Sequence, residues 1–466
     1  MRFVKFIVFI FALFLFSCIE DSTPPTQDDV DPSMIDYKPY SLDSLTGKII
    51  DTDIMIEDFS SASTCKDCHQ AIYDEWSNSF HALSFNDPIF MSMWSSEKAH
   101  RPETGKTYCI QCHAPAAFVT GYSLDGIENT SDIQNSDIPD IIKEGVSCDI
   151  CHTMVDKSPS VRTEDHVAAV AQYYLNPGED VKYGSIQDPD CGSSSSQGHT
   201  DCVYLPLFNS SSSCKPCHNQ FIREMPIEAT FSEWDNHPGL AMGGPSCQNC
   251  HMPKNGSHSS HYFAGADLLF YDGVDVYSDQ YQQVTNLLKQ AVTIDFEYSG
   301  GSQSSYYIEN DILYFPILIT NMTGHRLPSG TPFSREVWLE IIVISDTGEV
   351  VFQKGVLNNS SEELNYDDSD LVFYTAILYD QENLEGNIIY EPSNALSYDD
   401  RTLRTLFYDQ KMYELDVSNV SGQLTVYARM LFRPFKPQML SEFHPSSMIH
   451  LPIIEMYSDT LLVTIP

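Results

Sequence analysis

Basic residues are scarce in this chain. Its 466 residues include only 25 lysines and arginines against 65 aspartates and glutamates, which gives a formal net charge of −40. Because like charges repel, such a protein is unsuited to binding nucleic acid or anionic lipid head groups. The same charge favours solubility and attracts basic partners, but it carries no information about the fold.

The N-terminus lacks an apolar run long enough for a membrane helix, since the run extends only from Phe6 to Phe16. Two basic residues precede it, and the pattern predicts a signal peptide over residues 1–17. The residues LFSC end at Cys18 and resemble a bacterial lipoprotein cleavage box, so we expect Cys18 to carry lipid; ordinary cleavage nearby is the alternative. Residues 18–59 are acidic and contain proline, which predicts a lipid-anchored linker. We therefore expect an exported bacterial lipoprotein, periplasmic or anchored at the outer membrane or cell surface.

Cysteine is absent after Cys250, although the preceding part of the chain holds 13 cysteines. Ten of them form five CXXC pairs, and a histidine follows every pair. A zinc ribbon uses two such pairs for each metal ion and would leave one pair over, and neither zinc nor a redox dithiol needs histidine at that place. The motifs, numbered 1 to 5 in chain order, are CKDCH (65–69), CIQCH (109–113), CDICH (148–152), CKPCH (214–218) and CQNCH (247–251).

The order CXXCH is the attachment pattern of c-type haem. Two thiols bond to the two vinyl groups of one porphyrin, and the adjacent imidazole becomes the proximal ligand of its iron. We therefore predict five covalently attached c-type haems. The predicted attachment residues are Cys65, Cys68, Cys109, Cys112, Cys148, Cys151, Cys214, Cys217, Cys247 and Cys250, and the predicted proximal ligands are His69, His113, His152, His218 and His251.

Two cysteines remain after Cys18 and the motifs are assigned. Cys191 and Cys202 enclose a serine-rich loop, and an exported protein meets an oxidising environment. We predict a disulfide between them; two unpaired thiols are the alternative.

The distribution of motifs and of apolar residues predicts two domains after the linker. Residues 60–266 hold all five motifs, so little chain is available for each porphyrin, and we expect short helices and loops packed on the haems. Helices are expected near residues 71–79 and 221–234. Residues 283–466 follow a short helical stretch and alternate apolar and polar runs, with a DTGE turn at 346–349. This pattern predicts an all-β, immunoglobulin-like sandwich.

The segment CKDCHQAIYDEWSNSFHALSF, residues 65–85, resembles the opening of multihaem cytochromes related to the cytochrome c-554 family. The order of the later motifs is similar, and the resemblance covers most of residues 60–266. It implies that His81, His199 and His261 are distal ligands of haem iron. Further candidates for this role are His100, His166, His237 and His258.

The β-domain contains the segment TNMTGHRLPSG, which resembles a GH-x-LPTG segment that follows the haem domain in some of these proteins. Its histidine, His325, could reach a haem edge or brace a turn. The glycine and proline around it favour bracing.

Three functions are consistent with this sequence. The first is electron transfer through five haems, with basic redox proteins or other cytochromes as partners, membrane contact through the lipid anchor, and no nucleic acid. The alternative is a haem-dependent reductase or oxidase of a small nitrogen or sulfur compound at one five-coordinate iron. The CXXCK motif of pentahaem nitrite reductases is absent. In the third, the β-domain is an adhesive or docking module, or simply covers one end of the haem stack.

Overall fold

The fold comes from a computed structural model. The predicted signal peptide, Cys18 and His166 lie outside the residues that the structure describes. Within the described part, no helix is both long and apolar enough to cross a membrane. The described residues are 36–43, 46–156, 171, 173–189, 191, 199–268, 275–297, 305–358, 362–443 and 452–466.

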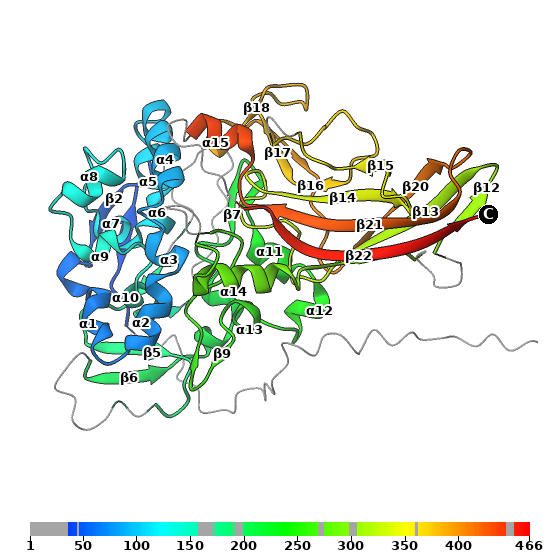
Figure 1. The fold of residues 1–466 in the computed structure, drawn as a ribbon. Coiled ribbons are helices and arrows are strands. Elements are labelled where there is room, and N and C mark those ends of the chain that lie inside the picture. Colours follow the sequence, from blue (N-terminus) through cyan, green and yellow to red (C-terminus); the bar gives the residue numbers. More distant parts are fainter. Residues whose placement is uncertain are drawn as a thin grey trace, which may run out of the picture.

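Short helices joined by loops make up residues 60–266, here called the motif region (Figure 1). Helix α4 (Pro88–His100) is the longest described there; Asp87 caps its N-terminus by accepting a hydrogen bond from the Phe90 backbone N–H at 2.7 Å. The helix predicted near residues 71–79 is present as α2. The other helices are α1 (Ala62–Lys66), α2 (Gln70–Ser77), α3 (Phe80–Leu83), α5 (Gly105–Tyr108), α6 (Ile110–His113), α7 (Pro115–Thr120), α8 (Thr130–Asn135), α9 (Asp140–Lys143), α10 (Cys148–His152), α11 (Thr230–Asp235), α12 (Pro238–Ala241) and α13 (Cys247–His251).

Pairs of short strands connect these helices. The pair β5–β6 is parallel and the other pairs are antiparallel. The strands are β1 (Tyr40–Leu42) with β2 (Ile49–Thr52), β3 (Met154–Asp156) with β4 (Tyr174–Leu175), β5 (Val181–Gly184) with β6 (Asp201–Tyr204), β7 (Gln220–Ile222) with β8 (Met225–Glu228), and β9 (Lys254–Asn255) with β10 (His258–Ser259).

The helix predicted over residues 221–234 is wrong in its first half. Strands β7 and β8 form an antiparallel hairpin there, and α11 begins only at Thr230. The two turn residues, Arg223 and Glu224, have positive φ angles of 46° and 64°, as a two-residue type I′ turn requires. Pro226 lacks a backbone donor and could not lie inside a helix.

An apolar core exists in the N-terminal half of the motif region, so the prediction of packing on haems alone is wrong for this part. Buried side chains between Ile54 and Leu175 form one cluster, which includes Phe85, Trp94 and Phe118. The long segments between motifs 1, 2 and 3 supply most of these side chains. This half therefore has an apolar scaffold of its own on which motif 2 is built.

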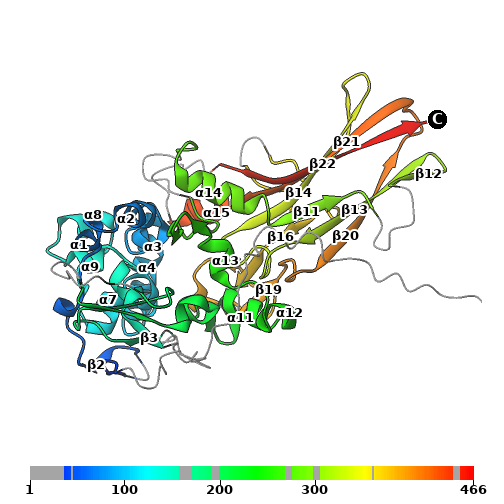
Figure 2. The same cartoon turned by 90° about the horizontal axis from the view of Figure 1, so that it is seen from below.

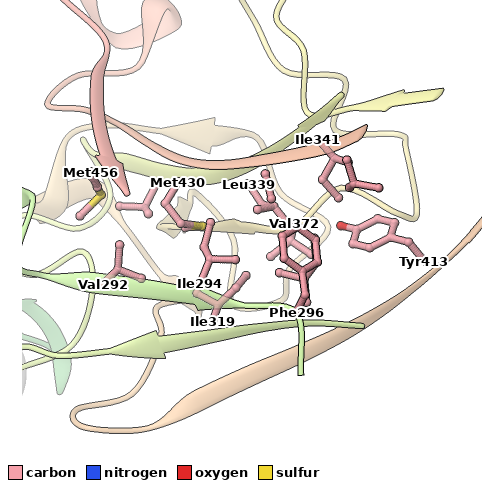
Figure 3. Packing of buried hydrophobic residues seen from close by; sticks show 14 of the residues in the cluster. Val292, Ile294, Phe296, Ile319, Leu339, Ile341, Val372, Tyr413, Met430 and Met456 are labelled. Atoms are coloured by element: carbon pink, nitrogen blue, oxygen red, sulfur yellow. The ribbon is translucent and has the colours of Figure 1, made fainter. Parts of the chain in front are cut away.

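Two facing antiparallel sheets form most of the β-region, residues 283–466, and their buried side chains share one core (Figure 3). In one sheet, β13 pairs with β11, β12 and β20; in the other, β14 pairs with β15, β16 and β21, and β21 pairs with β22. Ile294 and Ile319 meet Leu339 and Met430 between them. The strands of the two sheets are β11 (Val292–Asp295), β12 (Tyr307–Glu309), β13 (Ile312–Asn321), β14 (Glu336–Ser345), β15 (Val350–Lys354), β16 (Phe373–Tyr374), β20 (Tyr408–Asp416), β21 (Gly422–Arg433) and β22 (Ile454–Ile465).

The remaining elements complete the β-region. A separate small sheet has the strand order β18–β17–β19, and α14 begins at the short helical stretch seen in the sequence. The DTGE turn lies between β14 and β15, where Gly348 has a φ of 84°. These elements are α14 (Asp279–Leu288), β17 (Ala376–Tyr379), β18 (Ile388–Ile389), β19 (Ser397–Asp400) and α15 (Pro437–Phe443).

The motif region and the β-region pack directly against each other. Figures 1 and 2 show the helical part on one side, the strands on the other, and α11 to α13 near the boundary. Ile89 of α4 is buried against Met439 of α15. Arg335 forms two hydrogen bonds with Asp267, at 2.8 and 3.0 Å, between the end of the motif region and the start of β14.

Candidate haem sites

Each CXXCH motif forms a single helical turn. Motifs 3 and 5 are helices in themselves, α10 and α13. In motifs 1, 2 and 4, the backbone N–H of the histidine donates to the carbonyl of the first cysteine, at 2.9, 3.1 and 3.0 Å. Residues three apart in such a turn lie on the same side, so both thiols of a motif can face one porphyrin. All ten motif cysteines are free of disulfides.

Thiols from different motifs meet in pairs. Cys65 of motif 1 lies beside Cys148 of motif 3, close enough that each thiol shifts the pKa of the other. Cys112 contacts Cys217 in the same way, which joins motif 2 to motif 4. A third pair joins motifs 4 and 5 through Cys214 and Cys247. Every motif therefore has at least one other motif as an immediate neighbour.

Four of the five proximal histidines have their Nδ1 atom occupied by an acceptor. The partners of His113, His152 and His251 are backbone carbonyls, and that of His218 is a carboxylate. A hydrogen bond at Nδ1 fixes the ring and leaves Nε2 as the metal-binding nitrogen. The distances are 2.9 Å to Ser84 O for His113, 2.7 Å to Tyr183 O for His152, 2.9 Å to Glu228 Oε1 for His218 and 2.6 Å to Ala264 O for His251.

Three proximal imidazoles each face a second imidazole. The distance between ring centres is 6.3 Å for His218 and His81, 6.5 Å for His152 and His261, and 6.3 Å for His251 and His325. Two imidazoles that ligate one metal ion from opposite sides place their ring centres roughly 6 Å apart, because each metal–nitrogen bond is about 2 Å and each ring centre lies about 1 Å beyond the nitrogen. The three pairs therefore have the spacing of axial ligand pairs.

Burial keeps most of these imidazoles neutral. Together with nearby histidines, it lowers the pKa of His81 to about 3, and burial also lowers the pKa values of His251 and His261 to about 4. A neutral imidazole offers the lone pair that a metal ion binds, and these rings do not have to lose a proton first.

His218 differs because its partner is charged. Burial lowers the pKa of His218, but the hydrogen bond and the charge of Glu228 outweigh it and raise the pKa to about 9. The side chain of His218 is 46% exposed, so we attribute the net shift to Glu228. A carboxylate on Nδ1 makes the imidazole a stronger donor toward a metal ion at Nε2.

The position of His261 is set by Glu75 of α2. The Glu75 carboxylate accepts hydrogen bonds from the His261 backbone N–H at 2.7 Å and from Asn255 at 2.6 Å. It also pairs with the His258 ring at 3.1 Å. Glu75 is buried, and these bonds lower its pKa although burial alone would raise it. A residue next to motif 1 thus holds the imidazole that faces motif 3.

His81 lies in α3 and is fixed by the residues that precede motif 3. The backbone N–H of Val146 donates to the His81 carbonyl at 2.9 Å. Gly145 has a φ of 62°, and a Cβ atom there would come within 2.8 Å of the same carbonyl. Glycine is required at this position for both reasons. The glycine and valine of the EGVSCDICH stretch thus hold the imidazole that faces motif 4.

The structure does not pair His69 or His113 in this way. Among the described residues, no pair of histidine rings at the ligating spacing includes either of them. The ring of Phe90 stacks on His113, with ring centres 3.9 Å apart. His199, predicted as a distal ligand, belongs to no such pair; its buried Nδ1 has no hydrogen-bond partner in the described part of the chain.

The other candidates also lie apart from these pairs. His237 occupies the N-cap position of α12 without a side-chain capping bond, and its buried Nδ1 likewise has no described partner. His258 contacts Glu75, as above. His100 is 57% exposed and lies 3.4 Å from Glu391. Their ligand roles, like that of His199, stay predictions.

Cys191 and Cys202 are joined by a disulfide, with their Cα atoms 5.9 Å apart. Cys202 belongs to β6, which pairs with β5 beside His152. The disulfide therefore ties Cys191 to the strand pair next to motif 3.

A c-type haem fits these residues. The free thiols lie on one side of each turn, and Nδ1 of four proximal histidines is occupied. The ring centres of three imidazole pairs lie at the spacing of axial ligands. The bound group would supply one-electron redox chemistry at its iron. The chain supplies attachment, ligands, hydrogen bonds to those ligands and burial.

For His325 the sequence offers two roles, contact with a haem edge and bracing of a turn, and favours the second. The glycine and proline around it favoured a structural role in a turn, whereas the structure places its ring opposite His251. No spacing rule links residues 74 positions apart. The signal that could have found it is its histidine-containing loop, which resembles a segment following the haem domain in related proteins.

Comparison with known proteins gives a family match and a structural match. The family model described as "Cytochrome c554 and c-prime" matches residues 64–153, which include motifs 1 to 3. The penta-heme cytochrome c552 from Thermochromatium tepidum has a similar fold, with a TM-score of 0.63 and 20% sequence identity over 87% of this chain and 99% of that one. Residues 64–153 therefore match a cytochrome c family, and the chain has the fold of a penta-heme cytochrome.

The structural match extends beyond the motif region of this chain. Residues 60–266 are less than half of the chain, whereas the match covers 87% of it. The two-part fold, helical and then β-rich, is therefore shared with the Thermochromatium protein. No curated protein sequence matches the chain significantly.

Proposed function

We propose that this protein is a multihaem c-type cytochrome, an exported electron carrier that holds five c-type haems. The observation that carries the proposal is the set of three imidazole pairs at ligating spacing. An iron with a histidine on each face has no free position for a substrate, so its chemistry is limited to gaining and losing an electron. Such closed irons are suited to electron transfer, and they exclude catalysis at the same irons.

Contacts between motifs support a continuous path for electrons. Motif 1 meets motif 3, motif 2 meets motif 4 and motif 4 meets motif 5 through their thiols. Cys151 of motif 3 and Cys214 of motif 4 also interact electrostatically. Because the thiols attach to porphyrin edges, neighbouring thiols bring porphyrin edges together. We propose the order 1–3–4, with motifs 2 and 5 branching from motif 4.

Counting electrons tests this function. Each haem iron accepts one electron, so coulometric reduction of the full chain should take up five electrons, and a second cytochrome should reoxidise the protein completely. Uptake of fewer than five electrons would contradict the five haems. Complete reduction without reoxidation by any cytochrome acceptor would contradict the carrier role.

We also propose the location and partners that the sequence predicts: export, lipid on Cys18, and basic redox proteins or other cytochromes as partners. The net charge of −40 supports the partners, because it attracts basic surfaces during encounter. The rate of electron transfer to a basic cytochrome should fall as salt concentration rises. A rate that does not change with salt would contradict electrostatic steering. The assignment of the β-region to the immunoglobulin-like class is part of this proposal, supported by its two facing antiparallel sheets.

A further inference from the structure

We propose that His325 is the second axial ligand of the iron bound through motif 5, so that the β-region completes a haem site of the motif region. This inference rests on the proposed function, since it requires haem at motif 5. It assigns the β-region a part in a redox centre. The alternative roles of docking module or cover would leave haem ligation independent of this region.

The first support is the geometry of the two rings. His325 and His251 lie 6.3 Å apart between ring centres, with 25° between their planes. The pair His152 and His261, formed wholly within the motif region, has nearly the same arrangement at 6.5 Å and 23°. A loop histidine that only braced its turn would have no reason to reproduce this arrangement.

The second support is the hydrogen bonding of each ring. Nδ1 of His325 bonds to the carbonyl of Arg326 at 2.8 Å, and Nδ1 of His251 bonds to the carbonyl of Ala264 at 2.6 Å. Each ring therefore donates its proton at Nδ1 and keeps Nε2 as the nitrogen with a free lone pair. This is the tautomer that a histidine adopts when it ligates a metal ion through Nε2.

The loop that carries His325 is fixed within the β-region. Asn321, at the end of β13 and fully buried, donates from its side-chain nitrogen to the carbonyls of His325 at 2.9 Å and Leu403 at 3.1 Å. Thr323 donates to the His325 carbonyl at 2.7 Å. The ring is therefore carried on a backbone whose position the sheet determines, as a preorganised ligand requires.

Residues of the motif region also form hydrogen bonds with this loop. Glu233 of α11 accepts hydrogen bonds from the Arg326 backbone N–H at 3.0 Å and from the Ser329 hydroxyl at 2.6 Å. Thr230, three residues earlier, accepts from the Gly330 backbone N–H at 3.1 Å. Both belong to the segment between motif 4 and motif 5, so the chain that leads to His251 also holds the loop of His325.

Gly324 lies beside α11 and α12, immediately before His325. A Cβ atom added at Gly324 would lie 3.4 Å from the Trp234 ring and 3.7 Å from Leu240. Because α11 holds the loop through the side chains of Glu233 and Thr230, these two are positioning residues for this ligand.

The test is the variant His325→Ala in the full chain. We expect the haem content to stay at its wild-type value, one further iron to change from low spin to high spin in electron paramagnetic resonance, and added imidazole to restore the low-spin signal. The matched control is Arg326→Ala, which removes the neighbouring side chain of the same loop, paired with Asp400 at 2.7 Å, and leaves the imidazole of His325 in place. An unchanged low-spin count in His325→Ala would overturn the inference.

A second variant covers the case in which His325→Ala fails to fold. His325→Met keeps a ligand of suitable length, and methionine in place of histidine raises the potential of a haem. We expect one haem with a higher midpoint potential; five unchanged potentials would overturn the inference. Glu233→Ala should give a partial high-spin fraction that imidazole removes. A wild-type chain without haem would overturn the proposed function itself, whereas unchanged ligation in a haem-loaded variant overturns only the role of His325.

Discussion

The imidazoles of His152 and His261 face each other across 6.5 Å although the two residues are 109 positions apart in the chain. His152 follows its two cysteines directly, whereas His261 reaches its place because Glu75, beside motif 1, binds its backbone. Three separate segments therefore build one candidate iron site. Motifs 4 and 5 are built in the same way. In each, the proximal histidine follows its own cysteines, and the histidine that faces it comes from a distant part of the sequence.

Replacing His261 should open this site. In His261→Ala we expect one iron to change from low spin to high spin, because the proximal ligand stays while the opposite face loses its nitrogen donor. Electron paramagnetic resonance of the oxidised protein measures the change. His258→Ala is the control, since His258 contacts the same Glu75 carboxylate without facing a proximal ring. Loss of a low-spin iron in the control but not in His261→Ala would show that the two histidines have been assigned the wrong way round.

Glu228 should lower the potential of the haem at motif 4. Its carboxylate accepts a hydrogen bond from Nδ1 of His218 at 2.9 Å and stabilises positive charge at the ferric iron. In Glu228→Gln the bond can remain while the charge is lost. We expect one midpoint potential to rise by on the order of 50–100 mV in spectroelectrochemical titration. A fall in potential, or equal shifts at all haems, would be inconsistent with this local effect.

Carbon monoxide should distinguish closed irons from open ones. It binds ferrous haem only at a free axial position, so the irons held by His152 with His261, by His218 with His81 and by His251 with His325 should not react. Any uptake should come from the irons of motifs 1 and 2, and a carbon monoxide difference spectrum measures it. Uptake by more than two irons in each chain would contradict the ring pairs. A reactive iron at motif 1 or 2 would revive the alternative of a small-molecule reductase or oxidase.

Asp87 should make the fold less stable as pH rises. It is 7% exposed at the start of α4, and burial raises its pKa from 3.8 to about 6. Because the folded-state pKa lies above the unfolded value, the favourable contribution is complete below about pH 4 and is lost as pH rises through about 6. The loss is about 3 kcal/mol at most for a shift of roughly two units. It should be visible in urea unfolding at pH 4.5 and 7.

Asp87→Asn provides the control for this pH effect. Asparagine caps a helix about as well as aspartate but carries no charge. The difference in free energy of unfolding between pH 4.5 and 7 should therefore be smaller in the variant than in the wild type, while other titrating groups act equally on both. An identical pH dependence in the two proteins would exclude Asp87 as its source.

Local chemistry explains which parts of the site the sequence could predict. Each CXXCH motif is one helical turn, so residues that are adjacent in sequence are also adjacent in space. The helix α2 and the turn at Gly348 are likewise local. The apolar residues between Phe221 and Glu228 suit either a helix or a hairpin, so their pattern does not predict β7–β8. Pro226 argues against the helix, and the positive φ angles at Arg223 and Glu224 make the turn of the hairpin.

Distal ligands depend on packing between distant segments, which a single sequence does not reveal. His81 and His261 were predicted from family resemblance, and the structure places both opposite proximal rings. His325 lies beyond the segment that carries the resemblance to the haem domain, and its position follows from contacts between α11 and the loop after β13. Strand β20 likewise depends on packing, since few of its side chains are buried and its pairing with β13 stabilises it.

The number of haems bound to each chain tests the central claim most directly. Pyridine haemochrome absorbance measured against protein mass, together with the intact mass of the purified exported protein, gives this number. We predict five covalently bound haems in each chain, one for each CXXCH motif. A value near zero, with zinc bound at the cysteine pairs, would contradict the claim.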